Sequence, residues 1–310
     1  MKSKYLYKYF INLENGKCQK KGNFIIRNDE NFTQFNGNYF MYTARINNVP
    51  FYLKPIGEQN ELIQPIASSQ LLKHVGIATP PIFVTNDYDD FFATTQDIQN
   101  LPINTIIASK ITTSDQYNIH RKMSKATDFP SYWLEKWRFI KDYKHLFLEF
   151  MTPECFDEFV SMFLIDEIRT EQDCHDDNYF LWKRPNSDKY EGIIRFDLDN
   201  VFITNGYVTS IDDFKDFLEQ EYFSYDPFLH KDWKSYTDRH NDLRELLNED
   251  ILSNNNIVVL RNALEFDLPQ TIKTIGKKYN MEENEINKIY TPIAMLWEYN
   301  RKHLGKDLEI

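Results

Sequence analysis

The sequence has 310 residues, of which 42% are hydrophobic and 27% charged, a composition typical of a globular protein with one large domain or two fused lobes. The formal net charge of −11 disfavours nucleic acid as a partner, because binding to phosphates needs a basic face. No apolar run approaches the ~20 residues that a membrane-spanning helix needs, so we expect no transmembrane segment.

The first half of the chain predicts a strand-rich region. Asn36-Gly37-Asn38 and Asn47-Asn48 are turn signals between its first predicted strands. One helix is expected over Leu62–Val75, because its apolar residues follow helical spacing, and Gly76 is expected to end it. Short aromatic and β-branched runs predict strands at Asn23–Arg27, Tyr39–Arg45, Pro50–Pro55, Pro81–Thr85, Asp90–Thr95 and Asn104–Lys110.

The second half of the chain predicts helices. Thr152-Pro153-Glu154 is a strong helix start, with Thr as the N-cap and Pro at the first helical position. The wide apolar face that follows, from Phe156 to Ile168, indicates a central, buried helix. Further helical patterns lie at Ser210–Glu221, Ser235–Asn248, Asn256–Glu265, Leu268–Tyr279 and Glu282–Tyr299. We therefore expect an α+β fold of two lobes, a strand-rich N-lobe over residues 1–112 and a mainly helical C-lobe over residues 113–310.

A polar, acidic segment lies between the buried helix and a predicted strand. It contains Asp173, His175 and Asn178, and the return strand ends in a further carboxylate, Asp197. Pairing of the two strands as a hairpin would place Asp197 close to this loop. Asp and Asn oxygens are hard ligands that suit Mg²⁺ or Mn²⁺, and a separate Asp can accept the proton of a substrate hydroxyl. The alternative is structural, since Asp and Asn are also common in loops because they cap and turn.

Two stretches of this region resemble a known kinase family. DCHDDNYFLW followed by IIRFDLDN resembles the D-x-H-x-x-N motif and later Asp of the HipA-like serine/threonine kinases, which include CtkA-type bacterial kinases and are distantly related to phosphatidylinositol 4-kinases. The resemblance implies a protein-kinase-like fold in which Asp173 is the catalytic base and His175 supports the catalytic loop. It implies that Asn178 and Asp197 are the metal ligands. Asp199 is a rival ligand, because strand alternation returns a side chain two residues on to the same face.

The N-terminal region agrees with this resemblance. FNGNYFMYTARINNVPFYLKP resembles the phosphate loop and lysine-bearing strand of CtkA-like kinases, which implies nucleotide binding by Asn36, Gly37 and Asn38 and by Lys54. IIASKITTSDQY resembles the strand that runs into the hinge between the lobes. It implies that backbone groups of Ser109, Lys110 and Ile111 read the adenine edge.

The partner of the lysine departs from the family pattern. The family places a Glu on the N-lobe helix to hold the lysine, and here that register falls at Gln64-Pro65. We therefore expect Glu61, one turn earlier, to pair with Lys54, with Glu58 as the fallback.

The resemblance implies an ATP-dependent kinase that uses Mg²⁺, or alternatively Mn²⁺, to phosphorylate a Ser or Thr hydroxyl of a protein. Two alternatives stay open: a phosphatidylinositol or small-molecule kinase, and a catalytically weak, kinase-shaped binding protein. The three widely spaced cysteines (Cys18, Cys155 and Cys174) argue for a reducing compartment and against a disulfide framework. We expect a cytoplasmic location, in the bacterial cytosol, or in a host cytosol if the protein is a secreted toxin or effector.

Overall fold

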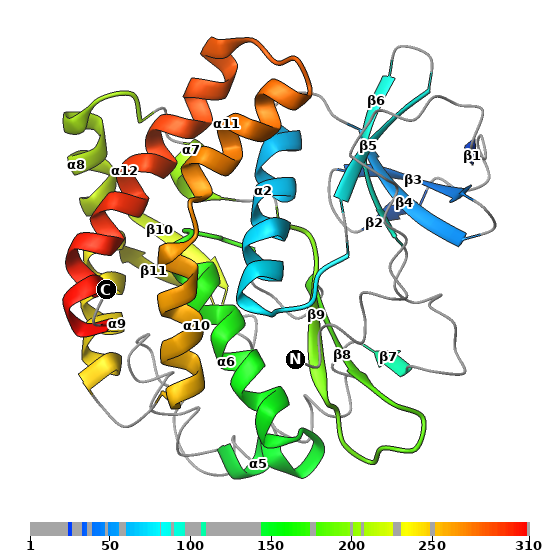
Figure 1. Cartoon of the computed structure of the whole chain (residues 1–310), viewed down its shortest axis with the longest axis horizontal. Coiled ribbons are helices and arrows are strands. Elements are labelled where there is room, and N and C mark those ends of the chain that lie inside the picture. Colours follow the sequence, from blue (N-terminus) through cyan, green and yellow to red (C-terminus); the bar gives the residue numbers. More distant parts are fainter. Residues whose placement is uncertain are drawn as a thin grey trace.

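The described part of the chain holds one large sheet, two small sheets and a set of packed helices (Figure 1). Among these residues, no helix has the length and apolar composition that crossing a bilayer requires. The computed structural model describes residues 24–26, 33–35, 39–46, 49–55, 60–80, 82–87, 90–96, 107–109, 144–173, 178–198, 201–205, 208–225, 231–248 and 252–308.

The N-terminal strands form a six-stranded antiparallel sheet in the order β1-β3-β4-β6-β5, with β2 paired to β3. Five of the strands lie where the sequence predicts strands. The predicted turn at Asn47-Asn48 falls between Ile46 of β3 and Val49 of β4, which are paired. The strands are β1 (Phe24–Ile26), β2 (Thr33–Phe35), β3 (Tyr39–Ile46), β4 (Val49–Pro55), β5 (Ile82–Asp87) and β6 (Asp90–Gln96).

The C-terminal half is helical, as predicted. At the start of α6, Thr152 Oγ1 accepts a hydrogen bond from the Cys155 backbone N–H at 3.2 Å, so Thr152 is the N-cap and Pro153 the first helical residue. Phe159 and Phe163 of α6 contact each other edge to face in the core, with their ring centroids 5.0 Å apart. The helices are α5 (Lys144–Phe150), α6 (Pro153–Ile168), α7 (Phe202–Asn205), α8 (Ile211–Glu219), α9 (Tyr236–Asn248), α10 (Asn254–Glu265), α11 (Leu268–Lys278) and α12 (Glu283–Leu308).

Helix α2 (Asn60–Val75) connects the N-terminal sheet with these helices. It packs against α10, α11 and α12 and also contacts β5, and Figure 1 shows it beside α11. Gly76 ends the helix at a φ of 89°, which an L side chain adopts only with strain. The Gly76 N–H donates to the Lys73 carbonyl at 3.3 Å and the Ile77 N–H to the Leu72 carbonyl at 2.9 Å, the pattern of a Schellman cap.

Two small sheets complete the fold. Strands β7 (Ile107–Ser109), β8 (Tyr179–Lys183) and β9 (Gly192–Arg195) form an antiparallel three-stranded sheet, and this includes the predicted hairpin. The second sheet pairs β10 (Glu221–Tyr225) with β11 (Lys231–Ser235), where the sequence analysis predicts no strands.

Candidate active site

The loop after α6 brings two of the predicted site residues into contact. Asn178 Nδ2 donates to Asp173 Oδ2 at 2.8 Å and to the Asp173 carbonyl at 3.0 Å. Asn178, directly before β8, is buried, whereas Asp173 is partly exposed. His175 and the adjoining Cys174 lie outside the described residues.

Asp197 follows β9 and meets the lysine of the N-terminal sheet. Its Oδ1 lies 3.5 Å from Lys54 Nζ, and the Asp197 side chain is 42% exposed. Lys54 is held on β4 opposite Ala93 of β6. The Asp197 backbone has a φ of 55°, a left-handed conformation that few residues other than Gly adopt, although Asp and Asn tolerate it best. Lys54 and Asp197, about 140 positions apart in the sequence, are thus brought within ion-pair distance of each other.

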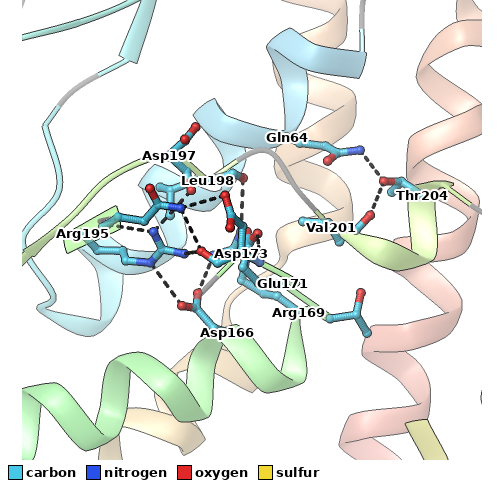
Figure 2. Close-up of polar contacts among 12 residues, drawn as sticks. Gln64, Asp166, Arg169, Glu171, Asp173, Arg195, Asp197, Leu198, Val201 and Thr204 are labelled. Atoms are coloured by element: carbon cyan, nitrogen blue, oxygen red, sulfur yellow. Dashed lines mark hydrogen bonds and ion pairs between the residues drawn. The ribbon is translucent and has the colours of Figure 1, made fainter. Parts of the chain in front are cut away.

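Gln64 stands where the family resemblance implies the Glu that holds the lysine, and it is hydrogen-bonded to α7. Gln64 is buried, and its Nε2 donates to Thr204 Oγ1 of α7 at 2.5 Å, while Thr204 Oγ1 donates to the Val201 carbonyl at 2.7 Å (Figure 2). Glu58 and the side chain of Glu61 lie outside the described residues, so their pairing with Lys54 stays a prediction.

The remaining predicted nucleotide residues are only partly described. Ser109 belongs to β7 and is paired with Leu181 of β8, so the predicted adenine strand lies in the same sheet as the hairpin that carries Asn178. The Ser109 side chain lies outside the described residues, as do the remaining predicted nucleotide-binding residues Asn36, Gly37, Asn38, Lys110 and Ile111.

A second group of charged side chains, which the sequence pattern does not mark as a site, is buried next to the candidate site. Its four members are Asp166, Arg169, Glu171 and Arg195. Asp166 of α6 contacts two arginines: its Oδ1 lies 3.2 Å from Arg169 Nη1 and its Oδ2 3.1 Å from Arg195 Nε. Arg169 Nη2 also lies 2.9 Å from Glu171 Oε2. Two positive and two negative charges thus compensate one another where none of the four side chains is more than 1% exposed.

The sequence contains a signal for this ion-pair network, namely charged residues within apolar patterns. Asp166 stands between Ile165 and Ile168 on the apolar helix, and Arg195 follows two isoleucines on an otherwise apolar strand. A charged residue inside a buried pattern needs a partner, because an isolated buried charge is strongly unfavourable.

The donor set of Asn178 and Asp197 fits a Mg²⁺ ion. The Nδ2 end of the Asn178 amide bonds to Asp173, so its Oδ1 is the end that suits a cation, and Asp197 supplies a carboxylate. Mg²⁺ prefers such hard oxygen donors and takes further ligands from water and substrate phosphates. Within the described ranges, no cluster of three or more His, Cys, Asp or Glu side chains could hold a metal ion.

The fold that carries this site is that of the HipA-like and CtkA-like kinases, which confirms the resemblance at the level of the fold. The proinflammatory kinase CtkA of Helicobacter pylori aligns with 94% of this chain and 97% of its own, at 12% identity and a TM-score of 0.62. A chain from the complex of HipA, HipB and operator DNA of the Shewanella oneidensis MR-1 toxin–antitoxin system aligns with 100% of this chain and 73% of its own, at 13% identity and a TM-score of 0.52. No protein-family model and no curated protein sequence matches this chain.

Proposed function

We propose that this protein is an ATP-dependent kinase that transfers the γ-phosphate to a Ser or Thr hydroxyl of a protein. The observation that carries the proposal is the ion pair of Lys54 with Asp197, which brings a strand lysine to the hairpin next to the Asp173–Asn178 contact. A lysine, two metal-binding oxygen donors and a separate carboxylate are the parts that phosphoryl transfer requires.

In this proposal the molecule has two lobes, and the nucleotide binds between them. The six-stranded sheet is the strand-rich N-lobe and supplies Lys54. The helical C-lobe supplies the loop and hairpin with Asp173, Asn178 and Asp197. The adenine would lie against β7, whose backbone runs beside β8.

Each side chain then has one task. Lys54 binds the phosphates of ATP with its ammonium group and exchanges its ion pair with Asp197 for them, and Asn178 and Asp197 would hold Mg²⁺ through their side-chain oxygens. Bound Mg²⁺ supplies charge neutralisation at the phosphates. Asp173 accepts a hydrogen bond from the acceptor hydroxyl and orients its oxygen toward the γ-phosphorus.

The proposed transfer balances without a further reagent. The acceptor oxygen forms a bond to the γ-phosphorus, and the bond from that phosphorus to the bridging oxygen of ADP breaks. The hydroxyl proton passes to the Asp173 carboxylate, and the products are ADP and a phosphoester. The hydrogen bond from Asn178 Nδ2 keeps the Asp173 carboxylate oriented for this role.

The proposed acceptor class is a protein hydroxyl, as the two structural neighbours suggest. CtkA is described as a proinflammatory kinase, and HipA comes from a toxin–antitoxin system. These descriptions favour a protein hydroxyl as the acceptor and a toxin or effector as the biological role. The net charge of −11 disfavours an anionic membrane surface as the substrate.

The test is transfer of radioactive phosphate from γ-labelled ATP with Mg²⁺. The purified protein is incubated alone, with a generic protein substrate, and with vesicles that contain phosphatidylinositol. We expect labelled protein, in the substrate or in the kinase itself, and no label with an Asp197→Ala variant. Label in the lipid alone would make the protein a lipid kinase. Absence of transfer to any acceptor and of ATP binding would overturn the proposal.

A further inference from the structure

Arg195 contacts several segments of the candidate site. It is the last residue of β9 and its side chain is fully buried. Its backbone N–H donates to the Ala78 carbonyl at 2.8 Å, which ties β9 to the segment after α2. In Figure 2 its guanidinium points from β9 toward Asp166 and the loop that holds Asp173.

The guanidinium donates to the main chain of three of the proposed functional residues, Asp173, Asn178 and Asp197. Nη2 donates to the Asp173 carbonyl at 3.1 Å. Nη1 donates to the Asn178 carbonyl at 2.8 Å and to the Asp197 carbonyl at 3.3 Å, and it also contacts the Phe196 carbonyl. Three segments, namely the loop after α6, the start of β8 and the end of β9, are therefore joined through one planar group.

The Nε of the same guanidinium is bound by a buried carboxylate. Nε donates to Asp166 Oδ2 at 3.1 Å, and the other oxygen of Asp166 is bound by Arg169. Arg169 in turn binds Glu171, whose second oxygen accepts from the Asp173 backbone N–H at 3.3 Å. The Asp173 backbone is thus held at its carbonyl by Arg195 and at its N–H through Arg169 and Glu171.

The Asp197 backbone needs such support. Its φ of 55° is an unfavourable conformation that persists only where surrounding contacts determine it. The Arg195 donations to the carbonyls of Phe196 and Asp197 supply these contacts on both sides of that residue's φ angle. This backbone conformation in turn sets the direction in which the Asp197 side chain leaves the main chain.

We propose that Arg195 is a positioning residue for phosphoryl transfer, which fixes the backbones of Asp173, Asn178 and Asp197 relative to one another. The inference rests on the proposed kinase function. Arginine suits this role because its fork presents five donors in one plane, whereas lysine offers a point charge on a flexible stem. A misplacement of about 1 Å at such a site can reduce the rate about 10²-fold.

The test compares Arg195→Lys with Arg184→Lys, a matched change at an exposed arginine that pairs with Glu191. Circular dichroism and thermal melting first establish that each variant is folded. Steady-state kinetics then give kcat and KM for ATP, an electron paramagnetic resonance titration gives Mn²⁺ affinity in the presence of a non-hydrolysable ATP analogue, and fluorescence gives nucleotide affinity without metal.

We expect Arg195→Lys to lose kcat about 10²-fold and to bind Mn²⁺ more weakly, with metal-free nucleotide affinity retained, because Lys54 is unaffected. Arg184→Lys should match the wild type in all three measurements. A folded Arg195→Lys with wild-type kcat and Mn²⁺ affinity would overturn the positioning role while leaving the kinase function intact. A wild-type protein without transfer or Mn²⁺–nucleotide binding would overturn the kinase function, and the positioning role with it.

A second variant covers the case in which Arg195→Lys does not fold. Asp166→Asn keeps the shape of the anchor but removes the charge that both arginines share. It should show the same loss of kcat and Mn²⁺ affinity. A folded Asp166→Asn with unchanged kcat would overturn the proposal, and so would failure of both variants to fold, because Arg195 would then be a structural residue only.

Discussion

Lys54 Nζ lies 3.5 Å from Asp197 Oδ1, and this pair joins the N-terminal sheet to the hairpin of the candidate site. Both side chains are partly exposed, at 27% and 42%, so solvent screens the pair and its contribution to stability is small. Its importance is therefore positional. In the proposed kinase, phosphate oxygens would replace the Asp197 carboxylate beside this ammonium group, and Asp197 would then be available to bind a metal ion.

Replacing Lys54 with Met removes the ammonium group and retains the length and apolar stem of the side chain. We expect weaker ATP binding and loss of turnover, because the phosphates lose their cationic partner. Isothermal titration with ATP and the phosphate-transfer assay measure the two effects. Lys215→Met on exposed α8 is the matched control and should change neither. Unchanged affinity and turnover in Lys54→Met would refute the assignment of the lysine strand.

Asp197→Ala should abolish metal-dependent phosphoryl transfer with the fold retained, because Asp197 is exposed at the site and supplies the proposed carboxylate ligand. Asp199, which lies outside the described residues, is the rival ligand. We expect Asp199→Ala to keep most of the activity. The measurement is transfer rate against Mg²⁺ concentration for both variants. Full activity in Asp197→Ala together with an inactive Asp199→Ala would move the ligand two residues along the chain.

Asp173→Ala tests the base separately from the metal site. ATP binding should persist, and turnover should fall about 10²–10⁴-fold, the usual contribution of a positioned base. Binding is measured by titration and turnover by phosphate transfer, with Asp188→Ala in the exposed turn between β8 and β9 as the control. Equal loss of ATP binding and turnover would instead make Asp173 a metal ligand or a structural residue.

The sequence contained enough information to place the loop and hairpin of the site. The Thr152–Pro153 start defines α6, the apolar runs define β8 and β9, and a hairpin between them brings Asp197 back toward Asn178. These are local signals: a capping residue, short apolar runs and a turn. Such signals predict which residues are paired across a hairpin, because the local sequence of the two strands and their turn determines the pairing register.

The contacts that cross between distant segments were not predictable in the same way. Asp166 and Arg195 are 29 residues apart in sequence, and their pairing has no periodic pattern that reveals it. The neighbours of α2 were also hidden, because the helix is buried on several sides and includes the polar residues Gln64, Ser68 and Ser69 in its buried surface. Strands β10 and β11 stabilise each other by pairing, so the polar sequence of Lys231–Ser235 alone favoured no strand.

Gln64→Glu restores the residue type of the kinase family at that register, but the structure predicts destabilisation. Gln64 Nε2 donates to Thr204 Oγ1, whose own hydrogen is directed to Val201, so a buried carboxylate would face a hydroxyl lone pair. The expected loss is about 1–3 kcal/mol in the free energy of unfolding, measured by urea denaturation. Gln70→Glu on the exposed side of α2 is the control. A more stable and more active Gln64→Glu would mean that the new carboxylate reaches Lys54.

We expect His240 on α9 to give the protein a pH-dependent stability that does not involve the candidate site. The residue is buried among aromatic rings, with its ring centroid 5.1 Å from that of Tyr299, and its Nε2 has no hydrogen-bond partner among the described residues. The pKa of His240 is lowered from 6.5 to about 4, chiefly because burial disfavours the charged ring. The charges of His303 and Arg244 contribute to this lowering, and Asp307 opposes it.

The sign of the effect follows from proton binding. Between the folded and unfolded pKa values of His240, about 4 and 6.5, the unfolded chain binds more protons than the folded protein, so stability rises with pH. This contribution is fully present above the unfolded pKa and is lost as the pH falls toward the folded pKa. At about pH 5 the wild type should have lost roughly 2 kcal/mol relative to about pH 7 through this residue.

His240→Phe removes the titrating group and retains a ring of similar shape. Its free energy of unfolding should therefore fall less between about pH 7 and about pH 5 than that of the wild type, by roughly 2 kcal/mol. Urea denaturation at both pH values measures the difference, and comparing the two pH values within each variant cancels any packing change that the substitution introduces. His145→Phe, at an exposed position of α5, is the matched control and should retain the wild-type pH dependence. Equal pH dependence in His240→Phe and the wild type would show that His240 does not titrate in this range.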